Sequence, residues 1–154
     1  MSRVLILCGV LFSGHDAFAT EWSRILEDGV LTASISIDNL SYFEALCDQG
    51  INIPITSMSL MVQGNMPAPG EKIEFRFGDQ ARIYAYADPE GVIASLTQDD
   101  AEVFQQLLVE MKSRSQMMVR LASGVRQTFP LDGSEAALAG CVPDAEKLSG
   151  VQGS

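Results

Sequence analysis

The sequence predicts a mainly β protein with one or two helices, folded as an antiparallel β-sandwich or a small barrel-like domain with one disulfide. Two observations predict the strands: apolar and polar residues alternate in several short segments, and turn residues separate them about every 8–12 positions. A third observation predicts the disulfide: two cysteines remain after an export leader is removed. We expect one domain over residues 20–141 and a flexible C-terminal tail over 142–154.

Residues 1–19 have the order of features that is typical of a signal peptide. Arg3 precedes an apolar run over 4–12, and Ala17-Phe18-Ala19 fits the small-x-small cleavage pattern. The run is too short to cross a bilayer, which needs about 20 helical residues. We therefore predict cleavage after Ala19 and a periplasmic or secreted protein. Cleavage would remove His15, the single histidine.

Eight segments are predicted as strands, seven firmly and one as an optional hairpin partner, which gives seven or eight antiparallel strands. In each firm segment one set of alternate residues is apolar, as in a strand with one buried face. Pro130 places the last of them at a sheet edge. Residues 91–96 are the optional segment, expected to return as a hairpin partner after the Asp88-Pro89-Glu90-Gly91 turn. The firm segments are 31–38, 42–48, 57–62, 72–77, 82–87, 117–121 and 127–131.

One clear helix is predicted over residues 99–114. Thr97 and the acidic residues after it suit a helix start, and Phe104, Leu107, Leu108 and Met111 form one apolar stripe. A short alanine-rich helix is expected over 134–140, ending near the second cysteine of the mature chain. We expect the central helix to pack on one end or face of the sandwich.

The charge and the cysteines limit the possible functions. The formal net charge is −10, so binding to nucleic acid or to an anionic membrane surface is not expected. Cys47 and Cys141 most simply form one structural disulfide in an oxidising compartment. A redox-active pair is the alternative, but the two cysteines lack the Cys-x-x-Cys spacing.

Few residues are placed for catalysis or metal binding. Without a histidine the mature chain lacks the usual general base for a serine nucleophile, and Asp99-Asp100 is explained by helix capping. We therefore expect no enzyme activity, no catalytic residues and no cofactor. The alternative is a periplasmic methionine-rich copper-binding protein, because thioethers favour Cu(I). Its candidate ligands are Met58, Met61, Met66, Met111, Met117 and Met118, which ordinary core packing also explains.

The best candidate for a recognition surface is one face of the strand over 82–87. Arg82, Tyr84 and Tyr86 alternate there and therefore share a face. Arginine and tyrosine are enriched at binding hot spots. The alternative is that the helix or the second sheet covers this face. Trp22 is a further partner-binding candidate, unless it anchors the first segment to the core.

Short motifs along the chain resemble those of a group of small exported bacterial proteins. They are Trp22, Leu46-Cys47-Asp48, the strand and turn over 73–79, and the ending over 129–141, which runs from Phe-Pro-Leu-Asp-Gly through an alanine-rich stretch to Cys141. In these the chain is similar to the invasion-associated locus B family and to the related VasI-like proteins associated with type VI secretion. The resemblance implies a periplasmic β-sandwich held by a disulfide, and it transfers no catalytic residue.

The expected function is that of an exported, non-enzymatic interaction or accessory protein of the bacterial envelope or of a secretion system. Its partner would be a protein of that envelope or secretion system.

Overall fold

The computed structural model of the chain describes residues 21–48, 56–79 and 81–143. The predicted leader and most of the predicted tail lie outside these residues. Within them, nine strands form two antiparallel sheets, and two helices accompany them. This is a β-sandwich with one disulfide, as the sequence predicts.

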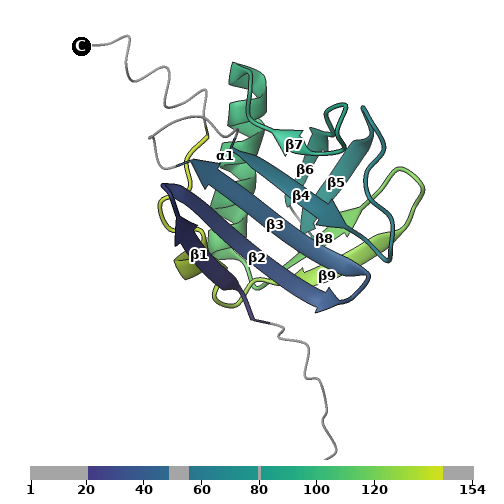
Figure 1. Cartoon of the computed structure of the whole chain (residues 1–154). Helices are drawn as coiled ribbons and strands as arrows, with labels where there is room; N and C mark the ends of the chain where they lie inside the picture. Colours follow the sequence, from purple (N-terminus) through teal and green to yellow (C-terminus); the bar gives the residue numbers. More distant parts are fainter. Residues whose placement is uncertain (1–20, 49–55, 80, 144–154) are drawn as a thin grey trace, which may run out of the picture.

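The first sheet has five strands in the order β1-β2-β3-β4-β7 (Figure 1). Three of its strands were predicted, and their inward residues, such as Phe43 and Leu60, are fully buried. The bounds are β1 Ser23–Glu27, β2 Val30–Asp38, β3 Ser41–Asp48, β4 Ser57–Met61 and β7 Ile93–Ala94.

The second sheet has four strands in the order β6-β5-β8-β9. Phe75, Val119 and Phe129 are fully buried on its inner face. Strand β9 is an edge strand, which confirms the position predicted from Pro130. The bounds are β5 Lys72–Phe77, β6 Ala81–Tyr86, β8 Gln116–Arg120 and β9 Arg126–Pro130.

Helix α1, Gln98–Ser113, confirms the long helix and its apolar stripe. Thr97 and Asp100 form a capping box at its start, in which the Thr97 side chain accepts from the Asp100 backbone N–H. The stripe residues Phe104, Leu107, Leu108 and Met111 are buried. Because α1 packs beside β6, the second layer of the sandwich consists of the four-stranded sheet and this helix (Figure 1).

The C-terminal helix α2, Ser134–Ala137, is shorter than the predicted 134–140. The backbone then turns through Gly140, whose φ is +87°, and brings Cys141 to β3. There Cys141 forms the predicted disulfide with Cys47, across 94 positions of the chain.

Two parts of the first sheet differ from the sequence prediction. Strand β1 was not predicted, because all five of its residues are exposed and leave no alternating pattern. Residues 91–96 do not return as a hairpin partner of β6. Instead β7 pairs with β4 in the other sheet, and the backbone N–H and hydroxyl of Ser95 both donate to the carbonyl of Thr56.

Among the described residues, no helix has both the length and the apolar character needed to cross a membrane.

Candidate functional site: the cationic face of the four-stranded sheet

The outward side of the four-stranded sheet carries the predicted recognition residues. Inward residues of β6 such as Ile83 and Ala85 are buried, and alternation therefore directs Arg82, Tyr84 and Tyr86 outward. Tyr84 is 41% exposed and Tyr86 is 63% exposed. The alternative that the helix or the second sheet covers this face is therefore wrong.

Strand pairing brings four further basic residues onto the same side. Outward residues of neighbouring strands are aligned in cross-strand rows. One row contains Tyr84, Glu74, Arg120 and Arg126. We call this outward side the cationic face; its basic residues are Lys72, Arg76, Arg82, Arg120 and Arg126.

The cationic face has a charge opposite to that of the chain. It holds five of the ten Lys and Arg residues of a chain whose net charge is −10. Among the described outward residues of these four strands, Glu74 is the one carboxylate. The face is therefore locally positive on an acidic body.

Glu74 is shared among three arginines at the centre of the face. Its Oε1 lies 3.3 Å from a terminal guanidinium nitrogen (Nη2) of Arg76 and 3.9 Å from Nε of Arg82. Its Oε2 lies 3.7 Å from Nη1 of Arg120. One carboxylate neutralises only one of these three positive charges, so the arginines keep capacity for a further anionic group.

The tyrosines add apolar surface beside the charges. The Lys72 ammonium lies over the Tyr84 ring, 4.0 Å from its centroid, which is a cation–π contact. Lys72, Tyr84 and Arg120 line an open hollow of about 240 Å³. A second hollow of about 250 Å³ is lined by Arg76, Asp79, Met118 and Thr128 among others. Both hollows are therefore lined by residues of the cationic face.

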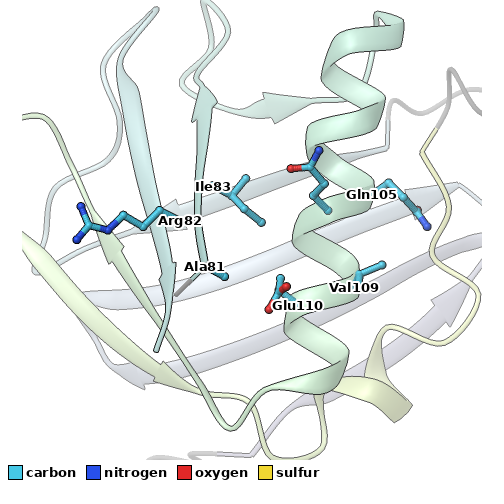
Figure 2. A pocket seen from close by; sticks show the side chains of 7 residues that line it. Ala81, Arg82, Ile83, Gln105, Val109 and Glu110 are labelled. Atoms are coloured by element: carbon cyan, nitrogen blue, oxygen red, sulfur yellow. The ribbon is translucent and has the colours of Figure 1, made fainter. Parts of the chain in front are cut away.

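A third hollow lies where β6 meets α1. It measures about 380 Å³ and is lined by Ala81, Ile83 and Val109 together with polar residues of the helix. Figure 2 shows that Arg82 extends away from α1. This hollow therefore borders the cationic face, but the Arg82 side chain points away from the helix that forms its other side.

Trp22 does not lie on the cationic face. Its ring packs edge-on against Phe43, with the two centroids 6.0 Å apart. Its indole N–H donates to the carbonyl of Pro130 at 3.0 Å. The structure therefore places this partner-binding candidate as an anchor of the segment before β1.

The candidate copper ligands are dispersed. Met58, Met111 and Met117 are fully buried in the core. Met61 points to the opposite side of β4 from Met58, and Met66 is exposed in the following loop. Among the described residues, no three His, Cys, Asp or Glu side chains form a metal-binding group.

Sequence reasoning missed the contributions of Lys72, Arg76, Arg120 and Arg126 to this face. Alternation within β5 and β8 already directed Arg76 and Arg120 away from the core. The pairing of β8 with β5 and β9, which aligns Arg120 and Arg126 with Tyr84, is a long-range feature with no local sequence signal.

Comparison with known proteins identifies one family. The family described as YfjT matches residues 20–138, which is most of the chain. No curated protein and no solved structure matches the chain. The family description names no activity, substrate or partner.

Proposed function

The chain belongs to the YfjT family, and from this premise and the cationic face we propose that it is an exported, non-enzymatic interaction domain. It acts in the periplasm as an accessory protein of the bacterial envelope or of a secretion system. Its partner binds the cationic face. The exposure of Tyr84 and Tyr86 beside an arginine cluster is the observation that carries this proposal.

The composition of the face supports a role in binding. Interface hot spots are enriched in Tyr, Trp and Arg, since these side chains combine a large contact area with hydrogen-bonding groups. Exposed tyrosine rings and half-exposed guanidinium groups add little to the stability of the sandwich, whose core lies on the other side of the sheet. A partner that covers them would use both their apolar area and their donors.

Two observations support the non-enzymatic part of the proposal. A chain cleaved after Ala19 has no histidine. The adjacent carboxylates Asp99 and Asp100 lie at a helix start, where Asp100 accepts from the Thr97 hydroxyl at 2.7 Å. That carboxylate is engaged in capping rather than placed opposite a second acid in a cleft.

The leader and the family match support export. The predicted cleavage falls between Ala19 and Thr20, and the family match begins at residue 20. The resemblance to the invasion-associated locus B and VasI-like proteins also implies the periplasm, and this resemblance stays a prediction.

Native mass spectrometry of protein recovered from the periplasm tests the proposed export. We expect a mass that begins at Thr20 and is two hydrogens lighter than the reduced chain. An uncleaved, reduced chain would overturn the proposed compartment.

Site-specific photo-crosslinking tests the interaction. A photoreactive residue replaces Tyr86 in the full chain, which is expressed with its own leader. The control carries the same residue at Ser36, an exposed position of β2 in the other sheet. We expect position 86 to crosslink one envelope or secretion protein that position 36 does not. Equal crosslinking at both positions, or none at position 86, would contradict the proposed function.

A further inference from the structure

We propose that the occupant of the cationic face is an acidic polypeptide segment of the partner. This inference rests on the proposed function and specifies the chemistry of the partner. The charge distribution is its first support, because half of the basic residues of a strongly acidic chain lie on one side of one sheet. A face of this kind attracts carboxylates and repels cationic groups.

The second support is that arginines directly oppose each other on two pairs of strands. Arg76 is the cross-strand partner of Arg82, and Arg120 is the partner of Arg126. Like charges that lie directly opposite in a sheet are destabilising, whereas opposite charges there are stabilising. The contact of one arginine with the other therefore does not stabilise the sheet in either pair. Glu74 already lies between Arg76 and Arg82 and also approaches Arg120. An anionic group bound beside Arg120 and Arg126 would offset the repulsion of the second pair.

The third support is an unsatisfied donor within the face. The Nε–H of Arg76 is buried and has no hydrogen-bond partner among the described residues. Arginine stays protonated in proteins, so this donor stays available to an acceptor. Arg76 also lines one of the two hollows of the face. Asp79 also lines this hollow, so a carboxylate that binds there approaches the Arg76 guanidinium from the side that Met118 and Thr128 form.

The partner chemistry is that of a polypeptide rather than of an extended polyanion. A membrane or an anionic polysaccharide carries charge over a wide area, and the acidic remainder of the molecule would repel it. A short segment with a few Glu or Asp residues contacts the cationic face alone. The exposed rings of Tyr84 and Tyr86 offer apolar contact to the side chains between its carboxylates.

A defined peptide tests the inference in solution. The probe is a short fluorescein-labelled peptide that alternates glutamate with leucine, and its control has glutamine at every glutamate. We expect the full-length mature protein to bind the glutamate peptide with a measurable change in anisotropy, and the affinity to fall as salt is raised. The glutamine peptide is expected to bind at least about tenfold more weakly.

Charge reversal at Arg126 separates binding from folding. In R126E a carboxylate faces Arg120, so this variant is expected to unfold at a higher temperature than the wild type. The same variant is expected to lose about tenfold or more in affinity for the glutamate peptide. The control is R114E, which makes the same change in net charge at the end of α1 and also breaks the exposed ion pair of Arg114 with Glu110. It is expected to bind the peptide as the wild type does.

Three results would overturn the inference. The first is equal affinity for the glutamate and glutamine peptides, or none for either. The second is an R126E variant that binds the glutamate peptide as tightly as R114E. The third is binding to phosphatidylglycerol vesicles, abolished in R126E, without binding to the peptide, which would make a lipid surface the occupant.

The crosslinking experiment distinguishes this inference from the proposed function. A partner captured at position 86 through a segment that lacks acidic residues would overturn the acidic occupant and leave the interaction function intact. If position 86 captures no partner above the position 36 control, the interaction function itself fails.

Discussion

At the scale of single residues, Trp22 shows how an aromatic side chain that suggests binding is used for packing instead. Its ring, Phe43 and Phe129 form a row of edge-to-face contacts that joins the segment before β1 to both sheets. Its N–H donates to Pro130 in β9, on the sheet opposite β1. Trp22 therefore connects the two layers at one end of the sandwich.

Replacing Trp22 tests this anchoring role. W22A is expected to lower the free energy of unfolding by about 2–3 kcal/mol, less than for a fully buried tryptophan because the ring is half-buried. W22F keeps a ring and loses the hydrogen bond, so a loss of about 1 kcal/mol is expected. Urea denaturation measures both. Crosslinking at position 86 should stay unchanged in W22F. A stable W22F variant that no longer crosslinks would instead make Trp22 a partner contact.

The residues of the cationic face were only partly predictable. Alternation within one strand was enough to place Arg82, Tyr84 and Tyr86 on one side, since the period of two is a local property. Their exposure depends on what packs above them, and their neighbours depend on strand register. Arg126 became part of the face only because β9 pairs with β8. A sequence read along one strand contains no such pairing signal.

At the scale of elements, the turn after β6 decides where the chain goes next. The Oδ1 atom of Asp88 accepts from the backbone N–H groups of Glu90 and Val92, both at 2.9 Å. Gly91 completes the turn with a φ of +81°, and a Cβ atom there would lie 2.7 Å from the carbonyl oxygen of Pro67. The turn therefore packs against a neighbouring loop. The chain then continues into β7, which pairs with β4 rather than with β6.

Two alanine variants separate the two reasons for a glycine at position 91, which are the left-handed backbone and the close contact with Pro67. G91A is expected to lose about 3 kcal/mol of unfolding free energy or more, because it combines a left-handed backbone with a clash against a backbone oxygen. G124A meets a similar φ of +90° with no atom within 4 Å of the added Cβ, so a loss of about 1 kcal/mol is expected. Thermal or chemical denaturation compares them. Equal losses in the two variants would show that the contact with Pro67 costs nothing.

The elements that the sequence predicted are those with a half-buried face. The firm strands and the long helix each bury every second residue or one stripe, and burial of that kind leaves a pattern in the sequence. Strand β1 has no buried side, and β7 has two residues, so neither leaves a pattern. The pairing of β7 with β4 joins segments that are far apart in the sequence, and no local pattern records it.

At the scale of the whole molecule, the cationic face and the disulfide belong to different sheets. The cationic face lies on the four-stranded sheet, whereas the disulfide joins β3 of the five-stranded sheet to the segment after α2. A partner can therefore bind the cationic face without contacting the disulfide. The excess of acidic residues outside the cationic face is expected to orient the molecule as it approaches an acidic partner.

The disulfide is expected to contribute more to stability than any other single feature of the sequence. It closes a loop of 94 positions, for which chain entropy gives an upper value of roughly 4–5 kcal/mol at 25 °C. Cys47 and Cys141 are both buried, so a reductant reaches the bond only after the protein opens.

The reduced protein is therefore prepared in denaturant and refolded with reductant present. Its free energy of unfolding is expected to be about 2–5 kcal/mol below that of the oxidised protein. The double variant C47A/C141A should match the reduced chain within about 1 kcal/mol and be insensitive to reductant. Identical stability of the oxidised and reduced chains would mean that packing around α2 holds this end of the sandwich without the covalent bond.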